Sequence, residues 1–171
     1  MSLNIAVVGC TGMVGSKFLE VLTERNIKAD NYYLYASEKS AGKEIDFMGK
    51  KHIVIKLCKE NIVDKKIDIA LFSAGASVSL EFAPVFASIG AIVIDNSSAW
   101  RRDENVPLVV PECNPEDIRK HHGIIANPNC STIQAVVALK PLDDKFKIKR
   151  IVYSTYQAVS GAGVKGYNDL K

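Results

Sequence analysis

The fold is decided near the N-terminus by NIAVVGCTGMVG, residues 4–15. Its first five residues form an apolar, largely β-branched run, which is typical of a strand buried in a parallel sheet. From Met13 onward apolar residues recur at helical spacing, and this pattern predicts a helix. Gly9, Gly12 and Gly15 allow a tight turn, and a helix N-terminus presents free N–H groups to a pyrophosphate. The stretch therefore predicts a dinucleotide-binding turn, and a purely structural turn is the alternative.

Strand and helix patterns alternate along most of the remaining chain. The predicted strands lie at residues 32–36, 67–72, 91–95 and 124–126, and the predicted helices at residues 79–89, from 114, and from about 130 to about 139. This alternation predicts an α/β fold, a Rossmann-like, doubly wound, mostly parallel sheet with helices on both faces. Residues 44–58 resemble a short hairpin or irregular strands with a turn at residues 49–51, and residues 150–158 form a final β-rich run.

Composition excludes several classes of protein. The 171 residues are 47% apolar and 24% charged, which excludes a disordered tail or a fibre. No apolar run approaches the roughly 18 residues that span a bilayer, so we expect no membrane segment. The net charge of +3 is small and scattered, so we expect no nucleic-acid partner. No secretion signal is found at the N-terminus, which favours a cytoplasmic protein.

No metal site is predicted. The four cysteines are widely spaced and form no CxxC pair, which gives no support to a zinc site or a redox dithiol. The adjacent His121 and His122 lie in a polar segment, where such a pair usually faces solvent. Free thiols in a reducing cytosol are expected rather than two disulfides.

A polar loop after the second predicted strand bears on the choice of cofactor. A free ribose 2′-hydroxyl is usually met by an acidic side chain at the end of this strand. Here Ser37 stands at that end, and Lys39 and Ser40 follow. Two hydroxyls and a cation suit a 2′-phosphate, so the loop favours NADP over NAD, although Glu38 argues against it. An ordinary solvated loop is the alternative.

The sharpest feature is NPNCST, residues 127–132, where a predicted strand leads into a helix. Free amides and the helix dipole stabilise a thiolate at such a position. A thiolate in a cofactor cleft can attack an acyl carbon and form a thioester. Cys130 is therefore the candidate nucleophile, whereas we expect Cys10, Cys58 and Cys113 to be inert core residues.

Six motifs together resemble the aspartate-β-semialdehyde dehydrogenase family. In chain order they are GCTGMVG, ASEKSAGK, DNSSAWR, VPECN, NPNCST and YQAVSGAG. N-acetyl-γ-glutamyl-phosphate reductases are similar in layout and are the alternative, but their cysteine typically lies in an NPGCYPT context. The resemblance implies the reversible, NADP-dependent reductive dephosphorylation of aspartyl-β-phosphate to aspartate-β-semialdehyde. This step precedes the branch to lysine, threonine and methionine.

The resemblance also implies roles for individual residues. Cys130 carries the acyl group, Asn129 fixes its turn among the substrate-binding residues, and Arg101 binds the substrate's phosphate. Gln157 contacts the substrate beside the thiol and is a donor to the developing oxyanion. The implied cofactor-binding residues are Gly9, Thr11, Gly12, Met13 and Val14 at the pyrophosphate, Ser37, Lys39 and Ser40 at the 2′-phosphate, and Ser160 and Gly161 at a further contact. The family more often has Arg where Lys39 stands, and lysine lacks the bidentate fork of arginine.

Two domains follow from the resemblance. Residues 1–127 correspond to an NADP-binding Rossmann-like domain, and residues 128–171 to the beginning of an α+β catalytic and dimerisation domain. In the family the general-base histidine lies beyond residue 171. We therefore expect a fragment, inactive alone, of an enzyme that is a homodimer or homotetramer at full length. A non-catalytic dinucleotide-binding module is the alternative, and the thiol reactivity of Cys130 distinguishes the two.

Overall fold

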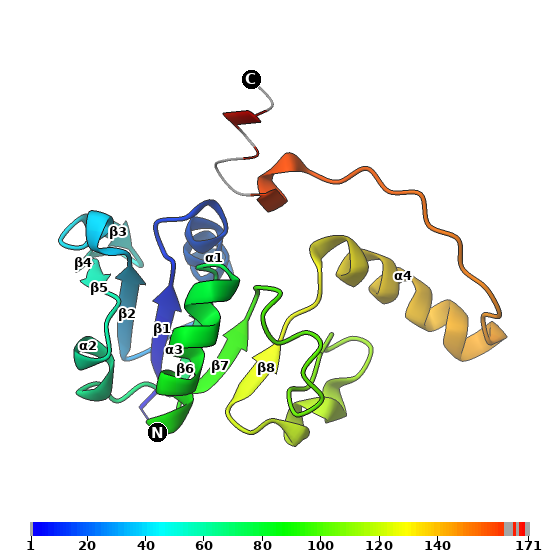
Figure 1. Ribbon diagram of the computed structural model, residues 1–171, viewed down its shortest axis with the longest axis horizontal. Helices are drawn as coiled ribbons and strands as arrows, with labels where there is room; N and C mark the ends of the chain where they lie inside the picture. The colour runs from blue at the N-terminus through cyan, green and yellow to red at the C-terminus, as the bar shows by residue number, and fades with distance from the viewer. Residues whose placement is uncertain (1, 163–165, 167, 170–171) are drawn as a thin grey trace.

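The computed structural model describes residues 2–162, 166 and 168–169. Its main sheet consists of β1 (Asn4–Val8), β2 (Asn31–Ala36), β5 (Ile55–Lys56), β6 (Ile69–Phe72), β7 (Ile92–Asp95) and β8 (Ile124–Ala126). The strands are parallel in the order β5-β2-β1-β6-β7-β8 (Figure 1). The strand order reverses between β1 and β6, which is the switch point at which doubly wound sheets bind ligands. The predicted Rossmann-like fold is confirmed.

Helices cover both faces of this sheet. They are α1 (Met13–Glu24), α2 (Glu60–Val63), α3 (Ala76–Ser88) and α4 (Cys130–Phe146), with the 3-10 helices η1 (Glu38–Ser40), η2 (Pro115–Lys120) and η3 (Val159–Ala162). On one face, Leu19 and Leu22 of α1 join the core. On the other, Phe86 of α3 packs edge-on against Tyr35 and Phe72. The two buried clusters lie on opposite faces because side chains alternate along each strand.

A hairpin of β3 (Glu44–Phe47) and β4 (Lys50–Ile53) forms a separate antiparallel sheet. The hairpin prediction is confirmed, but the turn lies at Met48 and Gly49 rather than at residues 49–51. Both residues have positive φ, 53° and 74°, as the two-residue turn of a tight hairpin requires. A non-glycine residue with positive φ is uncommon, so the sequence did not point to Met48.

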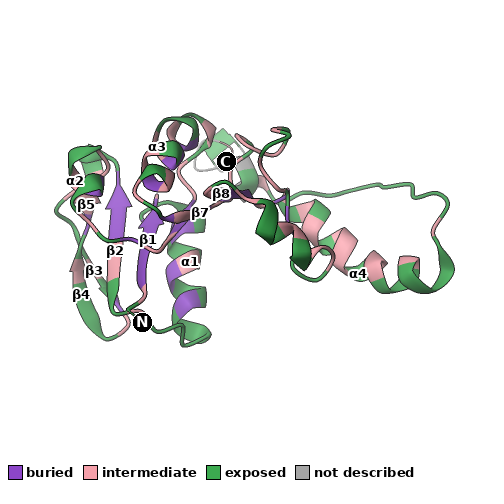
Figure 2. Ribbon diagram, turned by 90° about the horizontal axis from the view of Figure 1, so that it is seen from below, coloured by how far each residue is buried: buried purple, intermediate pink, exposed green. Residues whose placement is uncertain are grey.

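The helix α4 extends further than predicted, to Phe146 instead of about residue 139. Pro141 lies inside it, and the helix ends only where Lys147 adopts the left-handed conformation and donates its N–H to the Asp143 carbonyl. No described residue of α4 is buried, and the helix projects from the sheet (Figure 2). Its length therefore comes from local hydrogen bonds rather than from packing.

Two further predictions of local structure are wrong. Residues 150–158 form no strand, since no described strand lies beside them to supply hydrogen bonds; Val152 and Tyr156 are exposed. The helix predicted from Asn114 is the 3-10 helix η2, and Asn114 does not cap it. Instead its Oδ1 accepts the Val110 N–H at 2.9 Å and its Nδ2 donates to Asp117, which ties down the preceding loop.

Candidate functional site

The glycine turn joins β1 to α1 at the carboxyl edge of the sheet. Gly9 has a φ of +85°, and a Cβ there would lie 2.5 Å from the Ser73 carbonyl oxygen. A Cβ on Gly15 would lie 1.9 Å from the Gly9 carbonyl oxygen. Both positions therefore exclude any larger side chain. Gly12 precedes the first turn of α1, and no side chain caps that turn.

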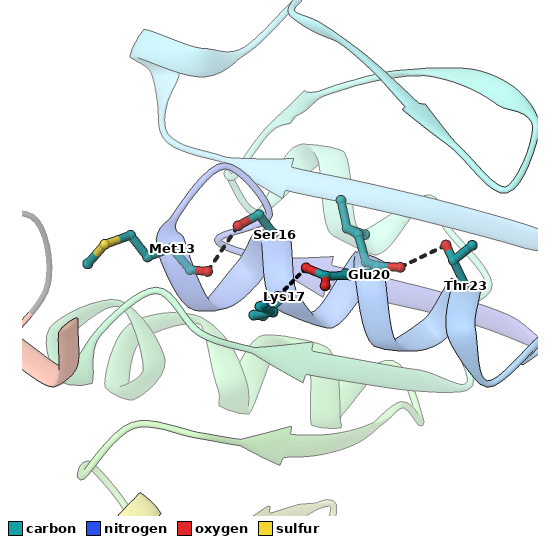
Figure 3. Close-up of polar contacts among 6 residues, drawn as sticks. Met13, Ser16, Lys17, Glu20 and Thr23 are labelled. Carbon is teal, nitrogen blue, oxygen red and sulfur yellow. Dashed lines mark hydrogen bonds and ion pairs between the residues drawn. The ribbon is translucent and has the colours of Figure 1, made fainter. Parts of the chain in front are cut away.

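Polar side chains of α1 leave its N-terminal amides open. Ser16 and Thr23 donate their hydroxyls to the carbonyls of Met13 and Leu19, each at 2.9 Å (Figure 3). The Met13 side chain extends beyond the start of the helix, away from these contacts (Figure 3). The first-turn N–H groups are thus available to an anion, which is the arrangement that a pyrophosphate requires.

A cavity of about 560 Å³ lies beside the glycine turn. Its lining includes four predicted cofactor residues, Gly9, Thr11, Gly12 and Ser37. The Thr11 hydroxyl donates to the hydroxyl of Ser40 at 3.3 Å, so the loop after β2 folds against the turn. Lys39 is exposed on η1 and is not among the residues that line this cavity. The structure therefore brings together most of the predicted nucleotide contacts, but it does not bring Lys39 to the cavity wall.

An ion pair that the sequence did not indicate lies on this cavity. The Lys56 Nζ lies 2.6 Å from Glu38 Oε1, and both residues line the cavity. The hydrogen bond from Lys56, reinforced by its charge, lowers the pKa of Glu38, and the same contact raises the pKa of Lys56. The carboxylate that argued against NADP is therefore paired with a cation.

A second cleft, of about 370 Å³, contains the candidate nucleophile. It adjoins the first cavity, since Ser73 lines both. Five predicted site residues from separate segments line it: Val14, Arg101, Asn129, Cys130 and Gly161. The carboxyl edge of the sheet thus brings predicted cofactor and substrate contacts into one space.

Cys130 is the first residue of α4 and is exposed. The preceding Asn129 caps the helix, because its Oδ1 accepts the N–H groups of Ser131 at 3.0 Å and Thr132 at 3.4 Å. Upstream, the Asn127 N–H donates to the Asp95 carbonyl at 2.8 Å. The thiol is therefore held between a capped helix and a strand end of the main sheet.

Arg101 reaches the cleft from the loop after β7. Its Nε donates to the Asn127 carbonyl at 2.9 Å and its Nη2 to the Asn96 carbonyl at 3.0 Å. Among the described residues, no group pairs with its Nη1. The guanidinium is therefore fixed by backbone carbonyls and keeps donors for an anion.

The same loop is held from beneath by the buried Asp95. Its Oδ2 accepts the Ser97 hydroxyl at 2.6 Å, and Ser97 Oγ accepts the Ala99 N–H at 3.1 Å. The other carboxylate oxygen, Oδ1, is buried with no hydrogen-bond partner among the described residues. Farther along, the Trp100 indole donates to the buried Ser79 of α3 at 3.0 Å. These contacts fix the backbone that carries Arg101.

Gln157 lies next to the thiol's helix turn but outside the cleft. Its Nε2 donates to the Ser131 hydroxyl at 3.0 Å, and it lines a pocket of about 200 Å³ together with Asn129. Ser160 belongs to η3, and its side chain is not described. Gly163, the last residue of the YQAVSGAG motif, lies outside the described residues.

The remaining cysteines differ from one another. Cys10 is buried at 1% exposure, and this burial raises the pKa of its thiol to about 11. Cys58 and Cys113 are half-buried, so the prediction that they are core residues is wrong. No group of three or more His, Cys, Asp or Glu side chains in the described part of the chain could hold a metal ion. Nor does any described helix have the length and apolar character to cross a membrane.

Several residues that line the two spaces were missed from the sequence. They are Lys56, Leu57, Ser73, Ala74, Gly75, Ala76, Val78, Phe82, Asn96, Ser97 and Ser98. Those after β6 and β7 had a usable signal, since the carboxyl ends of parallel strands meet at one edge. Lys56 had none, because its position depends on the pairing of the two-residue β5 with β2.

Comparisons with known proteins agree with this geometry. Residues 4–121 match the family model "Semialdehyde dehydrogenase, NAD binding domain", and residues 139–171 match "Semialdehyde dehydrogenase, dimerisation domain". An aspartate-semialdehyde dehydrogenase of Aquifex aeolicus is 64% identical over 173 residues, covering 100% of this chain and 51% of that protein.

Solved structures show the same likeness. Aspartate semialdehyde dehydrogenase II of Vibrio cholerae, complexed with ASA, superposes with a TM-score of 0.91 at 49% identity, over 99% of this chain and 51% of that one. The enzyme of Candida albicans with NADP gives 0.71 at 30% identity, over 85% and 48%. The chain spans about half the length of these relatives. Since the first family model alone accounts for most of its residues, the chain belongs to the aspartate-semialdehyde dehydrogenase family of semialdehyde dehydrogenases.

Proposed function

We propose that this protein, in its whole length, catalyses the reversible, NADP-dependent reductive dephosphorylation of aspartyl-β-phosphate to aspartate-β-semialdehyde. The observation that carries the proposal is the single cleft shared by Cys130, Arg101, Val14 and Gly161. A nucleophile, a phosphate-binding cation and two predicted cofactor contacts meet there. The relatives' names and the Vibrio cholerae complex with ASA support this choice of substrate.

Cys130 forms the covalent intermediate in this proposal. Its thiolate attacks the acyl carbon of the aspartyl phosphate, the bond from that carbon to the phosphate oxygen breaks, and phosphate leaves beside Arg101. The acyl group is then a thioester on Cys130. After reduction, the tetrahedral thiohemiacetal expels the thiolate and yields the aldehyde. The amides at the start of α4 are placed to donate to the developing oxyanion, as is the side chain of Gln157, which already contacts Ser131.

The nucleotide is held by the residues beside the glycine turn. The uncapped first turn of α1 receives the pyrophosphate, and Thr11, Ser37 and Ser40 lie where the loop meets the turn. Lys39 is proposed as a 2′-phosphate contact on the family pattern. When bound, NADPH supplies the hydride that reduces the thioester. The Candida albicans relative with NADP supports this cofactor over NAD.

Further expectations remain proposals. They are a role in lysine, threonine and methionine synthesis, a cytoplasmic location, a homodimer or homotetramer, a domain boundary near residue 127, and inactivity of the 171-residue polypeptide alone. The family model for a dimerisation domain over residues 139–171 supports self-association.

The test compares Cys130→Ser with Cys58→Ser, a matched control at a half-buried cysteine. NADPH formation from aspartate semialdehyde and phosphate is measured with the whole protein. Cys130→Ser should lose nearly all turnover yet keep cofactor binding, and Cys58→Ser should stay active. Turnover with N-acetylglutamate semialdehyde instead would support the reductase alternative. If iodoacetamide labels another cysteine ahead of Cys130, a non-catalytic nucleotide-binding module becomes the better reading.

A further inference from the structure

The ion pair between Glu38 and Lys56 lies where a dinucleotide's ribose is recognised. β5 pairs with the carboxyl end of β2, with Lys56 opposite Ala36, and the Leu57 N–H donates to the Ala36 carbonyl at 2.9 Å. The residues that follow Ala36 are those that read the ribose 2′ position in this fold. The backbone pairing thus sets Lys56 beside this reading position from a different strand.

Stability does not explain this pair. Its side chains are 79% and 46% exposed, and ion pairs at such exposure contribute little to folding. Both residues instead line the cavity that also contains Gly9, Thr11 and Ser37. Their placement therefore points to a role toward a ligand.

The charges of the pair decide which ribose the cavity accepts. A carboxylate at Glu38 repels a 2′-phosphate and can accept a hydrogen bond from a 2′-hydroxyl. A lysine ammonium has three donors, and Glu38 occupies one of them. The remaining donors can bond a phosphate while the first still neutralises Glu38.

We propose that Lys56 is the specificity-determining residue of the nucleotide site, bridging Glu38 and the cofactor's 2′-phosphate. This inference rests on the proposed use of NADP. Lys56 lines the cavity and Lys39 does not, so Lys56 provides the larger share of the discrimination. Glu38 is its counterpart and favours the free 2′-hydroxyl whenever Lys56 is missing.

Calorimetry on the 171-residue chain tests this with two probes, adenosine 2′,5′-bisphosphate and AMP, which differ only in the 2′-phosphate. Lys56→Met should weaken the bisphosphate about tenfold or more, the size of one charge-assisted contact, and leave AMP unchanged. Lys39→Met should weaken it less. Lys59→Met, at an exposed lysine outside the cavity, is the control and should change neither probe.

A double-variant cycle tests the bridging role. Glu38→Gln alone should strengthen the bisphosphate, and adding Glu38→Gln to Lys56→Met should recover part of the lost affinity, because the unpaired carboxylate is then gone. AMP binding reports whether each variant is folded.

The outcomes separate the two levels of the argument. If the unmodified chain binds both probes equally, the proposed NADP use fails, and the inference fails with it. If it prefers the bisphosphate and Lys56→Met does not alter that preference, only the inference is overturned. An absence of recovery in the double variant would refute the bridge between Glu38 and the phosphate.

Discussion

Replacing Asn129 by alanine tests whether a single side chain holds the candidate nucleophile in place. The Asn129 Oδ1 accepts two first-turn amides of α4, at 3.0 and 3.4 Å. No described residue of α4 is buried, so tertiary packing does not substitute for the lost cap. Loss of such a cap costs about 1 kcal/mol, which raises the opening equilibrium of the first turn about fivefold.

Hydrogen exchange measures this opening directly. The amides of Ser131 and Thr132 should exchange about fivefold faster in Asn129→Ala, in line with a cap energy of about 1 kcal/mol. The urea midpoint of the sheet should stay the same, because its core lies elsewhere. Alkylation of Cys130 should slow, since a frayed turn stabilises the thiolate less.

Asn129→Ser is the matched control, because serine also accepts an N-terminal amide. It should restore most of the protection and most of the Cys130 reactivity. If the two amides exchange equally fast in the alanine variant and the unchanged protein, the cap does not hold this turn. The reasoning that links the cap to the thiol would then be refuted.

Three further predictions concern the sheet edge. Gly15→Ala should destabilise the protein by more than about 1 kcal/mol in urea unfolding, because its Cβ would lie 1.9 Å from the Gly9 carbonyl; an unchanged midpoint would contradict this. Burial raises the pKa of Cys10 to about 11, so an unfolded thiol ionises first as pH rises. Stability should therefore fall from about pH 8.5 toward 11, a slope that Cys10→Val removes, as urea midpoints across pH would show. Asp95→Ala should cost about 1–3 kcal/mol by leaving the Ser97 hydroxyl unpaired, whereas Asp95→Asn, which keeps an acceptor, should cost less.

The sequence indicated those parts of the fold that depend on local patterns. The buried run of β1 and the glycine spacing lead directly to a turn at which a Cβ on Gly9 or Gly15 would collide with backbone. The junction at Cys130 was equally readable, because an asparagine before a helix is a common cap.

Features that depend on distant partners were not readable. Lys56 reaches the nucleotide cavity only because a two-residue strand pairs with β2, and no local pattern encodes that register. Residues 150–158 carry a strand-like pattern, but strands also need hydrogen-bonding neighbours, which the described residues do not provide. Pro141 suggested a helix end, but α4 continues through it.

The position of Cys130 at the base of α4 has a mechanical consequence. Its upstream neighbour Pro128 is buried, whereas the 17-residue helix beyond it is not packed into the sheet's core. At 1.5 Å per residue, Phe146 lies about 24 Å from the first turn, so a 10° swing about that turn would displace it by roughly 4 Å. Cys130, at the fulcrum, would scarcely move. A body attached to the far end of α4 can therefore rock through several ångströms while the sulfur keeps its distance from the nucleotide site.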